Sequence, residues 1–246
     1  MTVGHRTVIF VSYGHGRHDE RENVKTRTLI ICTALIAFGA ATAAAGTPRR
    51  PPNSSFSANV TNPWLPFKPG TRSVFTGIKN GKPSRDVVNV THTTKKIDGV
   101  PCVAIRDLLY VRGRLEERTT DWYSQDSKGN VWYFGENTAE LDRQGHVTST
   151  EGTWRTGVHG GKAGIFMPAN PRVGQSGQQE FLKGHAEDHF KVVAVFGKKL
   201  LLIKEWTPLE PGVIDHKFYA KGIGVVLEQT EKGGNERNEL VSVKRG

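Results

Sequence analysis

The sequence predicts an all-β protein: a single domain built on one strongly curved antiparallel sheet that forms a partly open barrel or a sandwich, with little helix. Three observations predict this fold. Runs rich in β-branched and aromatic residues recur at short, even spacing along residues 62–246. Links that contain Gly or Asn, such as "KNGKPS", "KKIDG" and "DSKGN", separate these runs and favour hairpins. No stretch of the sequence between them sustains a helical period.

Residues 1–45 end in the pattern of a secretory signal peptide. Lys25 and Arg27 precede an apolar run from Leu29 to Phe38, and small residues stand before Gly46. The pattern predicts cleavage after Ala45 and export to the periplasm or the extracellular space. The apolar run is short for a membrane span, so we expect no transmembrane segment after cleavage. A retained N-terminal anchor is the alternative.

The 23 polar residues before Val24 place this signal unusually far from the N-terminus. We therefore expect translation to start at Val24 from a GUG codon, which would leave residues 1–23 untranslated and would point to a bacterium. A precursor whose N-terminal sequence begins at Met1 would contradict this expectation. Cys32 lies in the apolar run, so Cys102 is alone in the exported chain and no intrachain disulfide is expected. Cys102 itself lies in an apolar strand run, which predicts a buried small side chain.

The exported chain is predicted to begin with a flexible leader and to continue as strands and turns. Residues 46–61 are rich in Pro, Ser and small residues and form the predicted leader, and residues 62–246 form the β domain. The predicted strands are "RSVFTGI", "SRDVVNVTHT", "VPCVAIRDLLYV", "RLEERTTDWYSQ", "NVWYFGE", "QQEFLKG", "DHFKVVAVF", "KLLLIKEW", "GVIDHKFYAK", "GVVLEQT" and "NELVSVK". Residues 149–177 carry seven glycines and no obvious strand. Such a long connection is expected to act as a lid or a ligand-contacting loop.

The stretch "DWYSQDSKGNVWYFGE", residues 121–136, is interpreted as a hairpin. Asp126 is expected to accept backbone N–H bonds within the turn while Gly129 takes a positive φ. Alternation places Trp122 and Tyr123 on opposite faces of the first strand, and Trp132 and Phe134 opposite Tyr133 on the return strand, so that both faces carry aromatic residues. These aromatic side chains either build a core or line a cavity. The candidate ligand-binding residues are Trp122, Tyr123, Trp132, Tyr133 and Phe134.

Four segments of the chain resemble a group of exported bacterial proteins of unknown function. They are "NPWLPFKPGTRSVF", "DWYSQDSKGNVWYFGE", "IFMPANPRVGQS" and "EWTPLEPGVIDHKFYAKGIGVVLE". The likeness spans about residues 62–243, and it implies export without implying a reaction or a ligand. The shorter "FYAKGIGVV" also resembles a strand-turn-strand closing element of exported β-rich proteins that handle lipids or belong to the envelope. That second resemblance favours lipid binding.

A second group of polar residues follows the Gly-rich stretch and forms the candidate metal site. In "GHAEDHF", His185 and His189 are four residues apart, which suits chelation on a helix; on a strand they share a face with Glu187 but are too far apart unless the chain bulges. Acidic residues of "KEWTPLEPG" could join Glu187 around a hard cation. The candidate metal ligands are His185, Glu187, His189, Glu205 and Glu210. A divalent cation is the alternative to having no cofactor.

The charge pattern argues against a nucleic-acid partner. The formal net charge is +10, but the basic residues come singly or in pairs with acids between them. Such a surface is expected to associate with anionic envelope components. No segment has the spacing of a nucleophile elbow or a phosphate-binding loop. The sequence therefore favours an exported, non-enzymatic module that binds a small apolar or amphipathic molecule; the alternative is a metal-binding protein or a metal-dependent hydrolase that uses residues 185–216.

Overall fold

The computed structural model describes residues 49–246 of the chain. These residues contain sixteen strands and one short 3-10 helix. These residues belong to one compact unit. The predicted signal peptide 1–45 and the predicted start at Val24 lie outside the described residues. The all-β prediction is confirmed, because the 3-10 helix η1 (Asn53–Ser55) is the only helix among residues 49–246.

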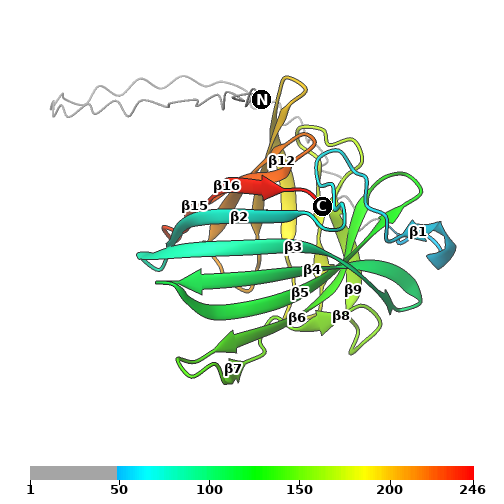
Figure 1. Cartoon of the computed structure of the whole chain (residues 1–246). Coiled ribbons are helices and arrows are strands. Elements are labelled where there is room, and N and C mark those ends of the chain that lie inside the picture. The colour runs from blue at the N-terminus through cyan, green and yellow to red at the C-terminus, as the bar shows by residue number, and fades with distance from the viewer. Residues whose placement is uncertain (1–48) are drawn as a thin grey trace, which may run out of the picture. The chain divides into compact units, whose positions relative to one another are not determined.

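The strands follow one another along the chain with short connections (Figure 1). The first half contains β1 (Phe56–Ser57), β2 (Arg72–Lys79), β3 (Lys82–Ile97), β4 (Val100–Val111), β5 (Arg114–Asp126), β6 (Val131–Leu141), β7 (Val147–Ser149) and β8 (Trp154–Arg155). The second half contains β9 (Lys162–Met167), β10 (Ser176–Gln178), β11 (Glu180–Phe181), β12 (His189–Phe196), β13 (Leu200–Trp206), β14 (Ile214–Ala220), β15 (Gly224–Lys232) and β16 (Arg237–Lys244).

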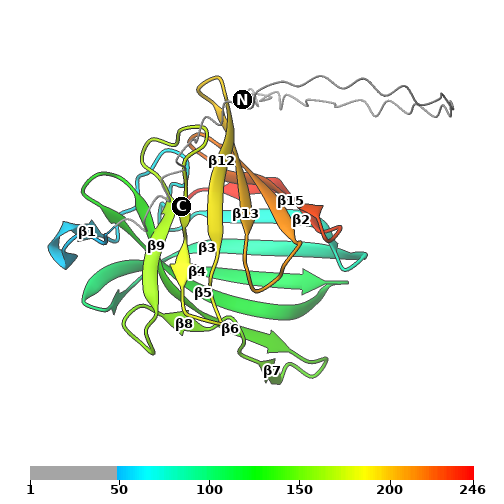
Figure 2. The same cartoon turned by 180° about the vertical axis from the view of Figure 1, so that it is seen from behind.

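The strands form one antiparallel sheet that curves into a nearly closed barrel. Its order is β10-β12-β13-β14-β15-β16-β2-β3-β4-β5-β6-β9-β11. Figures 1 and 2 show β2 to β6 on one side and β12, β13 and β15 on the other. The two ends of this order are adjacent in sequence, because β10 and β11 flank Gln179. The backbone of Gln179 accepts from Gly164 (3.1 Å) and donates to Asp188 (2.7 Å), so it joins the two edges of the sheet.

Gly164 is required where the barrel closes. A Cβ atom at this position would lie 2.1 Å from the carbonyl oxygen of Gln178. Only glycine allows two backbones to approach this closely without displacing one of them. The closure of the barrel therefore requires glycine at position 164. The hydrophobic pattern of the sequence does not predict where the barrel closes.

Three of the predicted hairpin turns adopt the tight two-residue form. The pairs Asn80–Gly81, Asp98–Gly99 and Arg112–Gly113 all have positive φ at both residues. This is the type I′ geometry, whose twist matches that of the flanking strands. The turns connect β2 to β3, β3 to β4 and β4 to β5 and fix the pairing register of this side of the barrel.

Two predicted segments differ in the structure. The leader expected at residues 46–61 is packed against the barrel from residue 53 onward: Phe56 pairs with Asp126 of β5 and is buried against Trp132. Its apolar side chains outweigh the polar composition of the segment. The stretch 149–177 was expected to lack strands, but it contains β8, β9 and β10. Its glycines permit close strand contacts rather than a free loop.

The sheet has a separate apolar cluster on each face. The inner cluster fills part of the barrel and includes Val90, Ile105, Tyr123, Leu201 and Tyr219. The outer cluster lies on the other face of β4, β5 and β6, and it consists of Phe56, Ile97, Val100, Cys102, Ala104, Trp122, Trp132, Phe134 and Ala163. Cys102 is buried there and burial raises the pKa of its thiol to about 12, which confirms the prediction of a buried small side chain.

Candidate functional site

The barrel encloses a cavity of about 190 Å³. Apolar side chains from several strands form much of its wall, because every second residue of a strand faces the interior. They include Phe75, Val90, Ile105, Phe166 and Val225. β9 supplies Phe166, so the Gly-rich stretch 149–177 contacts the cavity as part of the wall.

The segment before β2 covers one end of the cavity. Leu65, Pro66 and Phe67 line the cavity from this segment. The side chain of Asn62 anchors the segment by donating to the carbonyl oxygens of Gly129 (2.9 Å) and Pro168 (3.1 Å). The sequence "NPWLPFKPG" therefore forms a cap over this end of the cavity.

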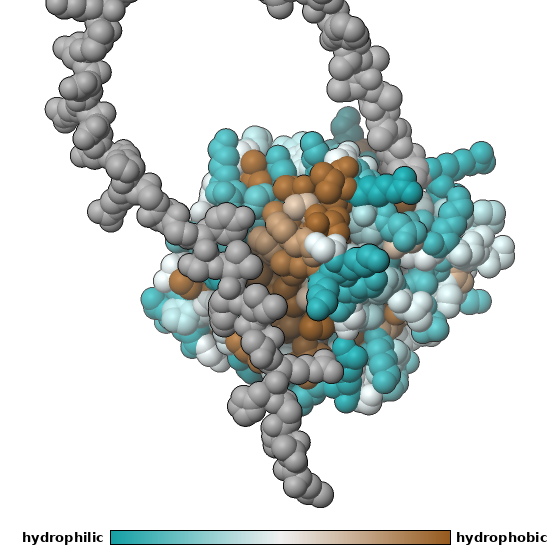
Figure 3. All heavy atoms as spheres, turned by 90° about the horizontal axis from the view of Figure 1, so that it is seen from above, coloured by the Kyte–Doolittle hydropathy of each residue, from teal (hydrophilic) through white to brown (hydrophobic). Residues whose placement is uncertain are grey.

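Ile223 marks where the cavity reaches the surface. This residue lies in the turn between β14 and β15, lines the cavity, and is 42% exposed. Seen from above, apolar side chains gather in one band that polar side chains border (Figure 3). A small molecule can approach the interior along the side of Ile223.

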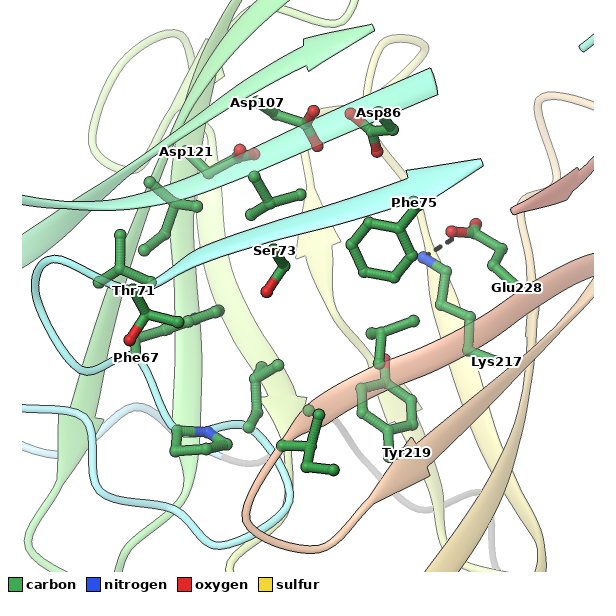
Figure 4. A pocket seen from close by; sticks show the side chains of 18 of the residues that line it. Phe67, Thr71, Ser73, Phe75, Asp86, Asp107, Asp121, Lys217, Tyr219 and Glu228 are labelled. Atoms are coloured by element: carbon green, nitrogen blue, oxygen red, sulfur yellow. Dashed lines mark ion pairs between the residues drawn. The ribbon is translucent and has the colours of Figure 1, made fainter. Parts of the chain in front are cut away.

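Three aspartates from adjacent strands form the polar side of the cavity. We call Asp86 of β3, Asp107 of β4 and Asp121 of β5 the aspartate row; all three line the cavity. Asp107 pairs with Val88, two residues from Asp86, and Asp121 pairs with Ile105, two residues from Asp107. The register therefore steps the aspartates diagonally across three strands, and Figure 4 shows them side by side.

Lys217 of β14 is the only basic residue among the cavity-lining side chains. Its ammonium lies 2.7 Å from Oε2 of Glu205 and 3.3 Å from Oε1 of Glu228. Figure 4 shows the pair with Glu228. Burial alone would lower the pKa of Lys217, but the two glutamates hold it well above its usual range. The remaining oxygen of Glu205 accepts from Nε2 of Gln179 at 3.0 Å. This cation is thus fully engaged with its own carboxylates.

Burial raises the pKa of two carboxyl groups in the row, those of Asp86 and Asp121. Desolvation, hydrogen bonding to Asp107 and repulsion from Asp107 and Glu228 raise the pKa of Asp86 to about 10. Desolvation and then repulsion from Glu136 raise the pKa of Asp121 well above its usual range, against a hydrogen bond from the Tyr133 hydroxyl. Asp86 therefore favours its neutral form near pH 7.

Two buried polar atoms of the cavity have no hydrogen-bond partner in the described residues: Oδ1 of Asp86 and the hydroxyl of Tyr219. Tyr219 is 0% exposed, and its hydroxyl points into the cavity (Figure 4). A buried polar group without a partner is costly, so such groups in folded proteins usually meet water or a ligand. These two atoms mark the part of the cavity where a polar group is expected.

The five predicted ligand-binding aromatic residues are divided between the two faces of the sheet. Tyr123 lines the cavity, and Tyr133 stacks on it with ring centroids 4.7 Å apart. The other three residues, Trp122, Trp132 and Phe134, belong to the outer cluster. The predicted alternation is confirmed, but the structure does not bring the five residues together in one cavity.

The predicted metal ligands are not brought together either. His185 and Glu210 are exposed in turns. The ring of His189 stacks on Trp206 on the outside of the barrel. The next residue of β12, Phe190, pairs with Glu205 of β13, and both face the barrel interior. Oε1 of Glu187 accepts from the backbone of Gly184 at 2.7 Å. Within residues 49–246, no three His, Cys, Asp or Glu side chains are placed to hold a metal ion. The metal site stays a prediction that no described contact supports.

The sequence reasoning missed the aspartate row, Lys217, Tyr219 and Glu228. The alternation of residues along the strands could have revealed the aspartates. In "SRDVVNV" Asp86 stands two residues before Val88, and in "TTDWY" Asp121 stands two residues before Tyr123. A charged residue in phase with buried apolar residues faces the core. Pairing between strands, which places three such residues next to one another, was not predicted.

No protein-family model and no curated protein matches the sequence. Two solved structures resemble the chain in a comparison of coordinates. One is a candidate exported protein with a YmcC-like fold from Bacteroides fragilis, which shares 14% identity over 74% of this chain and 99% of its own, with a TM-score of 0.41. The other is a candidate lipoprotein from Parabacteroides distasonis, with 10% identity over 74% and 98% of the chains and a TM-score of 0.39. No helix in residues 49–246 is long and apolar enough to cross a membrane.

Proposed function

We propose that this protein is an exported binding module that holds a small amphipathic molecule inside its barrel. One observation carries the proposal: the cavity joins an apolar wall to a polar side on which the Tyr219 hydroxyl and Oδ1 of Asp86 have no partner in the described chain. A ligand with an apolar body and one polar end would meet both requirements. Export is inferred from the signal pattern of residues 24–45, and the basic surface would then face anionic envelope components.

The volume of the cavity limits the size of this molecule. A dry cavity of about 150 Å³ can hold benzene, so 190 Å³ suits a ligand of roughly eight non-hydrogen atoms. A longer chain could extend past Ile223 into solvent. This size and the mixed wall favour a short amphiphile or the end of a larger one over a bulky lipid.

We do not propose a hydrolase or a metal-dependent enzyme. Among the predicted metal ligands, His189 and Glu205 lie on different faces of β12 and β13, and His185 and Glu210 lie in exposed turns. Asp215 of β14 pairs with Glu205, but no three His, Cys, Asp or Glu side chains of residues 49–246 are placed to hold a metal ion. The described residues thus bring together no group of side chains that could catalyse a metal-dependent hydrolysis. A binding role needs only the cavity and its opening.

The test uses hexan-1-ol as a neutral amphipathic probe. The full gene would be expressed in a bacterium with its own leader, and the protein would be purified from the periplasm. An intact mass equal to that of residues 46–246 would support the predicted cleavage after Ala45. Methyl NMR during hexan-1-ol titration should shift the signals of Ile105 and Val88, which line the cavity. The signals of Val100 in the outer cluster should stay in place. Equal shifts at all three, or none, would contradict the proposal.

A pair of variants on one strand tests the location directly. Ser73 lines the cavity, whereas Thr76 is exposed on the same strand. Ser73→Trp should fill the cavity and abolish hexan-1-ol binding. Thr76→Trp adds the same ring to β2 outside the cavity and should bind like the wild type. Unfolding curves of both variants would show that each is folded under the assay conditions.

A further inference from the structure

The carboxyl groups of the cavity outnumber its cations. Asp86, Asp107, Asp121 and Glu228 line it with one Lys, although the whole chain carries a formal net charge of +10. Lys217 is already paired with Glu205 and Glu228. No Lys, Arg or His side chain of residues 49–246 forms an ion pair with any member of the aspartate row. The basic excess of the chain therefore does not neutralise the row.

The hydrogen-bonding capacity of this region is also unfilled. Asp121 accepts one side-chain hydrogen bond, from the Tyr133 hydroxyl at 2.6 Å. Oδ1 of Asp86 and the fully buried hydroxyl of Tyr219 have no partner among the described residues. An ammonium group has three donors and no acceptor, and ionised carboxylates are acceptors only. A protonated amine placed between the row and Tyr219 would satisfy acceptors that the protein leaves free.

The arrangement suits an organic cation better than a metal ion. A divalent metal requires several oxygen ligands that converge at about 2.0–2.6 Å. Within residues 49–246 no three acidic or His side chains converge in that way. An ammonium group accepts longer hydrogen bonds from more widely spaced carboxylates, and it is attracted to aromatic faces such as those of Phe75 and Tyr123 beside the row.

We propose that the ligand is a small primary amine, whose ammonium group binds between the aspartate row and the Tyr219 hydroxyl while its apolar body occupies the rest of the cavity. This inference rests on the proposed function, because it names the polar end of the molecule that the barrel holds. The ammonium replaces the missing cation of the row. Burial raises the pKa of Asp86 and of Asp121, and the positive charge of a bound ammonium would lower both pKa values and so favour the charged forms.

The test compares three probes with the same six-carbon chain: hexylamine, hexan-1-ol and hexanoate. Each would be titrated calorimetrically into the full exported protein at one pH and ionic strength. We expect hexylamine to bind about tenfold or more tighter than hexan-1-ol, as the loss of a charge-assisted hydrogen bond predicts. Hexanoate should bind most weakly. If none of the three probes binds, the proposed function is refuted. If hexan-1-ol binds as tightly as hexylamine, only the assignment of an amine is refuted, and the proposed binding function stands.

Charge-removing variants locate the effect. Asp107→Asn should weaken hexylamine binding about tenfold and leave hexan-1-ol binding nearly unchanged. Glu140→Gln removes one charge from an exposed position of β6 and serves as the matched control. An equal loss in both variants would refute the site, since it would indicate attraction to the overall charge. If Asp107→Asn does not fold, NMR of the wild type decides: hexylamine must shift the Val88 methyl signals and not those of Val100.

Calcium provides the last comparison. Calcium chloride should not compete with hexylamine beyond the effect of an equal ionic strength of sodium chloride. Competition that EDTA reverses would overturn the amine assignment in favour of a metal ion. This outcome would leave the cavity itself intact, because hexan-1-ol binding does not depend on the cation.

Discussion

Two aspartates, the buried Asp126 on the outer face of the sheet and the half-buried Asp86 on the inner face, show how differently those faces are built. On the outer face, the carboxylate of Asp126 accepts from the backbone of Lys128 and Asn130, from the Asn130 side chain and from the Trp132 indole, all at 2.8–2.9 Å. On the inner face, one oxygen of Asp86 has no partner in the described residues. The carboxylate on the outer face is thus fully hydrogen-bonded within the protein. The inner face is left incomplete, which is typical of a surface that meets a ligand.

The largest expected effect concerns the packing of the outer face. Trp132 is 1% exposed and contacts Phe56 with ring centroids 5.9 Å apart. Trp132→Ala should lower the free energy of unfolding by about 4 kcal/mol, because it removes a buried ring and leaves a cavity. Urea unfolding measures this loss. Trp206→Ala, which truncates a half-buried ring stacked on His189, should cost clearly less. Equal costs would contradict the structural role of the outer cluster.

The next effect concerns the turn that holds this cluster. Asp126→Ala should lower the free energy of unfolding by about 3 kcal/mol, since it leaves buried donors such as the Trp132 indole unpaired. Asp142 is a matched control, because it accepts from the backbone of Gln144 and His146 in a similar but exposed turn. Asp142→Ala should cost clearly less than Asp126→Ala, because solvent screens the contacts of an exposed carboxylate. A similar loss in both variants would show that burial does not distinguish the two turns.

These two predictions also show what the sequence could supply. The hairpin, its turn at Asp126 and the facing of Trp122 and Tyr123 follow from period-2 alternation and turn chemistry, both of which act between near neighbours. The closure at Gln179 and the diagonal of the aspartate row depend on pairing between distant strands. Local patterns carry little information about such pairing. The packed segment 53–61 was missed because two apolar residues, Phe56 and Val60, outweigh its polar composition.

The inner face should make stability depend on pH. Asp86 faces Asp107 of β4, Glu228 of β15 and Lys217 of β14, and burial raises its pKa from 3.8 to about 10. The native state therefore keeps a proton that the unfolded chain has released. The contribution of Asp86 to stability is therefore fully present below about pH 4 and is lost as the pH rises towards 10, by at most about 1.4 kcal/mol per pH unit for this one proton.

Asp86→Asn removes that proton and should flatten the decline of thermal stability between pH 5 and 9. Some slope should remain, because burial also raises the pKa of Glu136, to about 7, and that of Asp121. Asp126→Asn on the outer face should leave the slope unchanged while lowering stability at every pH. An unchanged slope in Asp86→Asn would show that the inner aspartate is ionised in the free protein.

The smallest expected effect has the opposite sign. Tyr219→Phe should raise the free energy of unfolding of the ligand-free protein by about 1 kcal/mol, because it removes a buried hydroxyl that has no partner in the described chain. Tyr133→Phe removes a hydroxyl that donates to Asp121, so it should destabilise by a similar amount. In the presence of hexylamine, the advantage of Tyr219→Phe should shrink or disappear, since the wild-type hydroxyl then has a partner. A hydroxyl whose removal stabilises the free protein but weakens the complex is maintained for binding and not for folding. If Tyr219→Phe destabilises the free protein as Tyr133→Phe does, the inner face is already complete and the contrast between the two faces is wrong.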